Sequence, residues 1–120
     1  MRALAAGFVA VALLVACGGS NSPSQPAGST KVTMTEFKFD PSSLNMPSGK
    51  AVFFLVNSGS VSHDMIIRDS SNNRVAGSEL ISAGDSFVFT VDNIAAGTYT
   101  YYCDQPGHEA SGMKGTLTVT

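Results

Sequence analysis

Short runs of apolar and β-branched residues alternate with turn-forming residues along most of the chain, and no stretch sustains a helical period. The segment 74–82 has room for one short turn of helix. The run 51–56 is apolar throughout, which indicates a strand buried on both faces. The runs expected to form strands are 30–39, 51–56, 65–67, 86–91, 98–103 and 116–120.

Gly, Pro, Asn, Asp and Ser gather between these runs, where they favour tight turns. Their spacing is that of a sandwich of antiparallel strands. The ninety residues 31–120 can bury somewhat more than about 60% of their unfolded surface, which suffices for one core. We therefore predict that 31–120 forms a single all-β sandwich of about seven or eight strands. The turn segments are 40–43, 47–49, 57–60, 71–73, 83–85 and 96–97.

The N-terminal residues are predicted to lie outside this domain. Arg2 makes the N-terminus positively charged. The apolar run 3–16 follows it and is too short for a mature transmembrane helix. The ending Leu-Val-Ala-Cys resembles the bacterial lipoprotein processing box, so residues 1–16 are interpreted as a signal peptide and Cys17 as the lipidated residue. An ordinary secretory signal with an incidental cysteine is the alternative. The uncharged segment 17–30 is predicted to be a flexible, lipid-anchored linker.

Charge and cysteine content restrict the function of the domain. Residues 31–120 contain six basic and nine acidic residues without a basic run, so a nucleic-acid partner is not expected. With Cys17 assigned to lipid, only Cys103 remains, and the domain can form no internal disulfide. A single free cysteine in an exported protein is either an unwanted reactive thiol or a residue with a chemical role.

Cys103 is followed at five-residue intervals by His108 and Met113, between the last two predicted strands. A thiolate, an imidazole and a thioether form a soft ligand set that suits copper, and a second histidine would complete a blue-copper set. The chain has one other histidine, His63, which follows the turn at 57–60. Taken singly, each residue has an ordinary structural interpretation. Zinc also binds His₂Cys sets, although a methionine in the fourth place favours copper.

The run Tyr-Tyr-Cys-x-x-Pro-Gly-His-x-x-x-x-Met-Lys-Gly resembles the ligand loop of the cupredoxins of the azurin, auracyanin and plastocyanin kind. The run from Val56 to Asp64 resembles their first-histidine loop. The resemblance implies a cupredoxin-like Greek-key sandwich holding one type 1 copper ion. It also implies that His63, Cys103 and His108 bind the metal, with Met113 as the axial ligand.

The same resemblance assigns two supporting positions. The backbone N–H of Gln105 is expected to donate a hydrogen bond to the Cys103 sulfur. Asp64 stands where the family has an asparagine that ties the two ligand loops together. An aspartate has no amide donor to offer in that place.

The function implied is one-electron transfer outside the cytoplasm, and counting histidines argues against an enzyme. A second copper centre, or a hydrolase with a histidine base, needs a histidine beyond the two in the site, and the chain contains only two. An extracytoplasmic copper carrier or buffer is the principal alternative, and a purely structural copper ion is a third.

Partners and location follow from these interpretations. We expect a monomer that docks transiently near His108 with membrane-associated redox proteins. We expect the lipid on Cys17 to hold it at the periplasmic or cell-surface face of a bacterial membrane.

Overall fold

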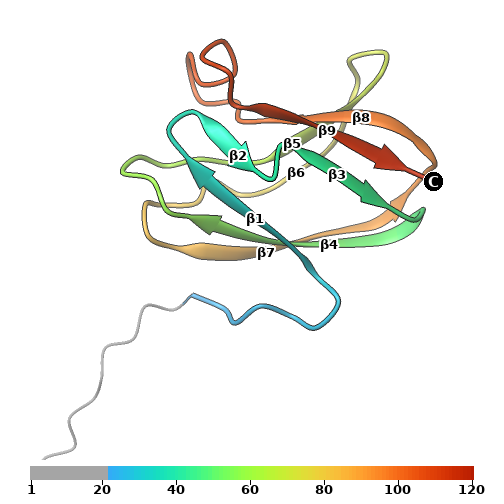
Figure 1. Cartoon of the computed structure of the whole chain (residues 1–120), viewed down its shortest axis with the longest axis horizontal. Coiled ribbons are helices and arrows are strands. Elements are labelled where there is room, and N and C mark those ends of the chain that lie inside the picture. Colours follow the sequence, from blue (N-terminus) through green and yellow to red (C-terminus); the bar gives the residue numbers. More distant parts are fainter. Residues whose placement is uncertain (1–21) are drawn as a thin grey trace, which may run out of the picture.

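The computed structural model describes residues 22–120, which form nine strands and no helix (Figure 1). The predicted signal peptide and the predicted lipid site at Cys17 lie outside the described residues. Within residues 22–120, no helix has the length and apolar character needed to cross a membrane.

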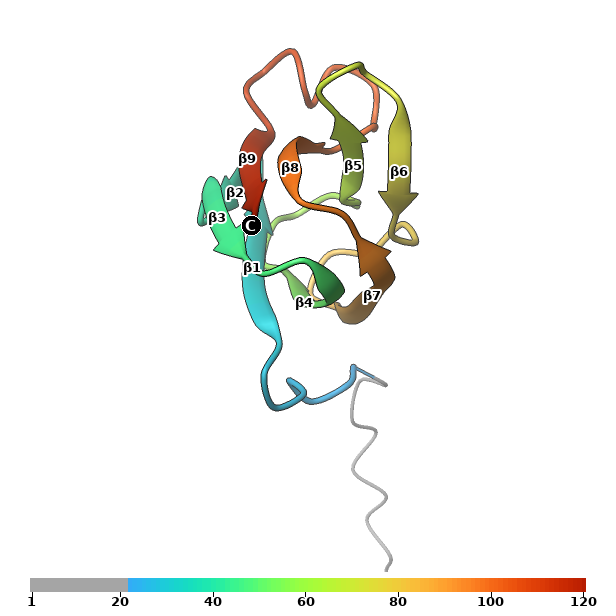
Figure 2. The same cartoon turned by 90° about the vertical axis from the view of Figure 1, so that its right-hand side faces the viewer.

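The strands form two sheets that face each other (Figure 2). One sheet contains, in spatial order, β2 (Lys38–Asp40), β1 (Thr30–Thr35), β4 (Gly49–Asn57) and β7 (Ser86–Ile94). The other contains β3 (Ser43–Met46), β9 (Lys114–Val119), β8 (Gly97–Tyr102), β5 (Ile66–Asp69) and β6 (Arg74–Gly77). The pairs β1–β4 and β3–β9 are parallel, and the other pairs are antiparallel. The predicted all-β sandwich is confirmed, but residues 22–120 form nine strands rather than seven or eight, and the two parallel pairs make both sheets mixed rather than antiparallel throughout.

The core lies between the sheets and is built from alternate residues of each strand, because successive side chains in a strand point to opposite faces. On β8, Tyr99 and Tyr101 are buried, and the alternation continues to Cys103 just beyond the strand. Burial of these apolar side chains is the main favourable contribution to folding. The same sheet adds Ile67, Leu117 and Val119, and the facing sheet adds Val32, Met34, Phe53, Leu55, Phe89 and Val91.

Three local features differ from the sequence prediction. The run 30–39 is a hairpin rather than one strand, with β1 and β2 joined by a two-residue turn at Glu36 and Phe37. Strand β3 begins at Ser43, inside a predicted turn. The predicted helical turn within 74–82 is wrong, because Arg74–Gly77 pairs with β5 as the edge strand β6. An edge strand with exposed side chains, such as Val75, lacks the alternation that marks a half-buried strand.

The loops that carry the predicted ligands meet at one end of the sandwich (Figure 1). His63 lies in the connection from β4 to β5, and the other three lie in the connection from β8 to β9. The β1–β2 turn reaches the same end, because the Glu36 side chain contacts His63.

Candidate metal centre

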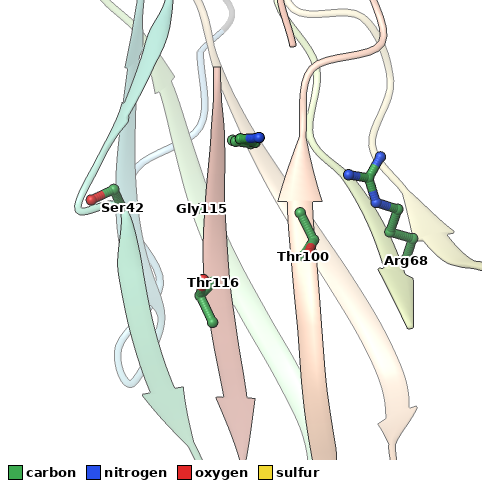
Figure 3. A pocket seen from close by; sticks show the side chains of 6 residues that line it. Ser42, Arg68, Thr100, Gly115 and Thr116 are labelled. Carbon is green, nitrogen blue, oxygen red and sulfur yellow. The ribbon is translucent and has the colours of Figure 1, made fainter. Parts of the chain in front are cut away.

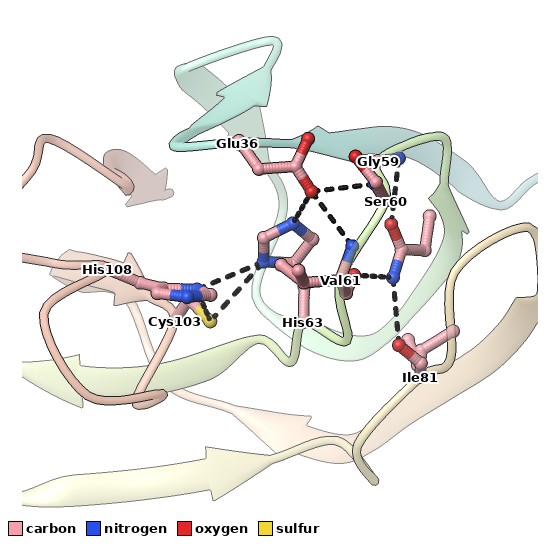
Figure 4. Close-up of polar contacts among 9 residues, drawn as sticks. Glu36, Gly59, Ser60, Val61, His63, Ile81, Cys103 and His108 are labelled. Atoms are coloured by element: carbon pink, nitrogen blue, oxygen red, sulfur yellow. Dashed lines mark hydrogen bonds and ion pairs between the residues drawn. The ribbon is translucent and has the colours of Figure 1, made fainter.

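The loop that carries His63 is held by backbone bonds and by a buried asparagine. The backbone groups of His63 pair with those of Ile81 in an antiparallel bridge, with N···O distances of 3.1 and 2.8 Å. The Asn57 side chain donates 2.9 Å hydrogen bonds to the carbonyls of Val61 and Ile81, and it accepts one from the N–H of Gly59 (Figure 4). A buried polar group is stable only when bonded in this way, so Asn57 fixes the path of the loop.

The loop between β8 and β9 closes on itself through its own backbone. The N–H of Cys103 donates to the carbonyl of Met113 at 3.2 Å, and the N–H of Met113 donates to the carbonyl of His108 at 3.1 Å. Gly107 and Gly112 have φ angles of 79° and 107°, a backbone region that favours glycine and allows the two tight bends. The folded loop therefore brings Cys103, His108 and Met113 together.

The three strongest ligand groups face one another across a small space (Figure 4). The Nδ1 atoms of His63 and His108 lie 3.2 Å apart. The Cys103 Sγ lies 3.4 Å from Nδ1 of His108 and 3.9 Å from Nδ1 of His63. Bonds of about 2.0–2.3 Å from one ion to three donors in a plane imply donor separations of roughly 3.5–3.8 Å. The observed spacing fits a trigonal metal site.

Burial at the centre differs from one residue to the next. The side chains of His63, Cys103 and Met113 are 0% exposed, whereas His108 is only partly buried. Burial is the main cause that lowers the pKa of His63, because it disfavours the charged imidazolium. A neutral imidazole is the form that binds a metal. Burial likewise raises the pKa of the Cys103 thiol. The donors therefore lie in a site that is shielded from water except at the partly exposed His108.

Two backbone amides act on the Cys103 sulfur. The N–H groups of Asp64 and Gln105 oppose the effect of burial and lower the pKa of the thiol. The expected hydrogen bond from the Gln105 N–H to the sulfur stays a prediction. The Asp64 carboxylate accepts a 2.9 Å hydrogen bond from the N–H of Asp104, so it links the two ligand loops as an acceptor, without an amide donor. Burial raises the pKa of Asp64 to about 6.

Glu36, which is not among the residues predicted for the site, places its carboxylate against His63. Its Oε1 accepts hydrogen bonds from the N–H groups of Ser60 at 2.7 Å and Val61 at 3.0 Å, and lies 3.2 Å from His63 Nε2. The backbone N–H groups of Val61 and Ser60 are the main causes that lower the pKa of Glu36 to about 2. The only signal in the sequence is a charged residue that interrupts a predicted strand, and such residues are usually solvated.

Phe37 and Arg68 also contact the ligand loop. The Phe37 ring, 42% exposed, packs edge-on against His108 with ring centroids 5.0 Å apart. The Arg68 guanidinium lies 4.4 Å from the Tyr102 ring centroid and forms a salt bridge with Glu109. Arg68 therefore joins the residue before Cys103 to the residue after His108.

A shallow groove of about 370 Å³ lies on the outer face of the five-stranded sheet (Figure 3). Arg68 borders this groove, but its guanidinium is engaged by Glu109 and Tyr102. The groove contains none of the predicted metal ligands. Its lining residues are Ser42, Arg68, Thr100, Lys114, Gly115 and Thr116.

A β-sandwich with a His₂Cys donor set and a buried methionine beside it defines a mononuclear copper protein of the type 1 class. The family model for copper-binding proteins of the plastocyanin/azurin family matches residues 26–120. The chain therefore belongs to this family, and copper is its cofactor. His63, Cys103, His108 and Met113 form a type 1 copper arrangement.

Individual relatives agree with this assignment. Plastocyanin from Scenedesmus fuscus is 33% identical over 88 residues, which span 68% of this chain and 85% of that protein. Auracyanin-B from Chloroflexus aurantiacus is 50% identical over 48 residues, but these span 40% of this chain and only 20% of that protein. The crystal structure of auracyanin B superposes with a TM-score of 0.69 at 28% identity, covering 86% of this chain and 96% of that one.

Proposed function

We propose that this protein carries single electrons between redox partners outside the cytoplasm, with one copper ion held by His63, Cys103, His108 and Met113. The observation that carries the proposal is the placement of the three strong donors, 3.2 to 3.9 Å apart in a frame built from two loops. When bound, the copper ion supplies reversible exchange between its +1 and +2 states.

The role of the chain is to hold the donors still in both states. The backbone bonds of His63 to Ile81, and of Met113 to Cys103 and His108, belong to the protein and do not depend on the metal. Because the sandwich fixes the donors, little has to rearrange when the charge of the site changes. The amides of Asp64 and Gln105 stabilise negative charge on the Cys103 sulfur.

Electrons would enter and leave through the partly exposed edge of His108. The exposed residues around it are mostly small or apolar and include Phe37, which contacts the ring. A small apolar patch suits the weak and transient docking of electron carriers. We define the docking patch as Phe37, Pro106, Gly107, Ala110 and Gly112.

We further propose that the protein works as a monomer tethered to a bacterial membrane by lipid on Cys17. The support is the sequence of the N-terminal region, in which an apolar run ends in Ala-Cys. A C17A variant of the full-length chain should then appear in the soluble fraction while the unchanged protein stays with membranes. Equal partitioning of the two proteins would contradict the tether.

Cyclic voltammetry of the copper-loaded full-length protein tests electron transfer against copper carriage. We expect a reversible one-electron wave, with copper retained in the reduced form when a Cu⁺ chelator is added. Rapid loss of the metal to the chelator on reduction would favour a carrier or buffer. Unfolding on removal of copper would favour a structural ion instead.

A further inference from the structure

Glu36 makes three polar contacts that converge on one carboxylate oxygen. Its Oε1 accepts from the backbone N–H groups of Ser60 and Val61 at 2.7 and 3.0 Å and lies 3.2 Å from Nε2 of His63 (Figure 4). The Glu36 side chain is 30% exposed, while the His63 side chain is 0% exposed. A carboxylate from the β1–β2 turn therefore reaches a fully buried ligand that lies in a different loop.

The contact determines which nitrogen of His63 carries the proton. Nδ1 faces the other donors, at 3.2 Å from Nδ1 of His108 and 3.9 Å from the Cys103 sulfur. Nε2 faces the Glu36 carboxylate, which can only accept a hydrogen bond when ionised. The proton therefore belongs on Nε2, and the Nδ1 lone pair is directed at the metal position.

The fold makes specific room for this carboxylate. A Cβ added to Gly59 would clash with the Glu36 carboxylate, so the glycine permits the close approach. The Oδ1 atom of Asn57 accepts a hydrogen bond from the Gly59 N–H and holds this part of the loop in place. Glu36 is thus bound by a prepared set of backbone donors, unlike a surface side chain that is free to turn into solvent.

The charge of Glu36 bears on the redox state of the centre. With a single thiolate, the metal and sulfur together carry a net charge of +1 when copper is oxidised and 0 when it is reduced. The negative charge of Glu36 lies one imidazole ring away from the metal position. It attracts the net positive charge of the oxidised centre, whereas the reduced centre has no net charge to attract. Because the His63 ring between Glu36 and the metal position is fully buried, the attraction is screened less than it would be in water.

We propose that Glu36 is a positioning residue of the copper centre, which fixes the tautomer and orientation of His63 and stabilises the oxidised state through its negative charge. The inference rests on the proposed function, because it requires copper at His63. It assigns a task to a residue that lies outside both ligand loops.

Three variants of the full-length protein separate the two parts of this inference. E36Q keeps a side-chain oxygen for the three donors but removes the charge. E36A removes both the oxygen and the charge. D92N is the matched control, because it removes an exposed charge from the far end of β7. The measurements are the midpoint potential by spectroelectrochemistry, copper affinity by chelator competition, and the His63 tautomer by ¹⁵N NMR of the metal-free protein.

We expect E36Q to keep the visible spectrum of the oxidised protein and to raise the midpoint potential, while D92N leaves the potential unchanged. We expect E36A to raise the potential as well and to weaken copper binding by roughly 10–100-fold, the usual effect of losing the partner of a ligating histidine. The NMR spectrum of the parent protein should show the proton of His63 on Nε2.

Two results would overturn this inference alone. One is an E36Q potential equal to that of D92N, and the other is an E36A affinity equal to that of the parent. The variant G59A tests the inference independently of the substitutions at Glu36. Its added Cβ should displace the Glu36 carboxylate and raise the midpoint potential without changing any charge. A parent protein with no type 1 copper spectrum would instead overturn the proposed function, and this inference with it.

Discussion

The backbone N–H of Asp104 donates a 2.9 Å hydrogen bond to Oδ1 of Asp64, and this contact joins the loop of His63 to the loop of Cys103. Asp64 directly follows His63, and Asp104 directly follows Cys103. The side chain of Asp64 is buried, whereas Asp104 is exposed, so the bond is partly shielded from water. One side-chain oxygen thus sets the relative position of two ligands that are distant in sequence.

Replacing Asp64 by alanine should destabilise the metal-free protein. D64A removes the acceptor of the Asp104 N–H, and the loss of a partly buried hydrogen bond costs about 0.5–1.5 kcal/mol. D64N keeps an oxygen acceptor and should lose much less. Urea unfolding of the three apoproteins measures the difference. Equal free energies of unfolding for D64A and the parent would show that the loops do not depend on this bond.

Arg68 should stabilise the ligand loop through its contacts with Tyr102 and Glu109. R68A removes a cation–π contact and a partly exposed ion pair, together about 1 kcal/mol. R68K should recover only part of this, because an ammonium group stacks less well on a ring. K31A, an exposed change on β1, is the control for lost charge. Chemical denaturation of the apoproteins should rank K31A above R68K and R68K above R68A, and equal values for K31A and R68A would refute the assignment.

Asp69 should make the stability of the β5–β6 hairpin dependent on acid. Its carboxylate accepts 2.9 Å hydrogen bonds from the backbone N–H groups of Ser71 and Asn73. The backbone N–H of Asn73 is the largest cause that lowers the pKa of Asp69. Because the folded-state pKa is depressed, this contribution is present above the unfolded value of about 3.9 and is lost as pH falls below it.

The prediction for Asp69 compares the parent with D69N, which shares every other titrating group. The parent should be the more stable protein at neutral pH, and its advantage should shrink as the pH falls through about 4 toward the depressed value. Urea unfolding at a series of pH values measures this difference. An advantage that stays constant across the acid range would contradict the role of the carboxylate.

Tyr101 and Gly115 lie opposite each other on β8 and β9. The Tyr101 ring covers the glycine, and a Cβ at position 115 would clash with it. The buried Tyr101 hydroxyl also donates a 2.7 Å hydrogen bond to the carbonyl of Pro41. G115A should therefore lower the free energy of unfolding by about 1–3 kcal/mol, as overpacking of a core does. T116A, on the exposed face of the same strand, is the control, and equal stabilities of G115A and T116A would contradict the packing argument.

The sequence identified the sandwich and the ligands because both depend on local signals. Strands such as β4 and β7 carry runs of apolar and β-branched residues, and the turns between strands carry Gly, Pro and Asn. The ligand loop keeps Cys103, His108 and Met113 at fixed spacing within one connection. Because the sequence contains only two histidines, His63 is the one histidine that can join His108 in the ligand set.

The remaining features depend on contacts between distant segments. Glu36 interrupts a run of strand residues, and nothing in its neighbourhood indicates that it reaches His63. Strand β6 is defined by pairing with β5 at a sheet edge, where exposed side chains leave no periodicity to detect. The role of Asp64 is likewise hidden in the sequence. Its residue type shows that it has no amide donor, but not that its carboxylate accepts a hydrogen bond from the Asp104 N–H and so joins the two ligand loops.

The most direct test of the central claim is the combined optical and electron paramagnetic resonance spectrum of the copper(II)-loaded full-length protein, measured with and without the change C103S. We predict an intense visible band from thiolate-to-copper charge transfer and a type 1 resonance signal, both lost in C103S. A weakly coloured copper(II) protein, or a visible band that survives in C103S, would contradict the assignment of the site.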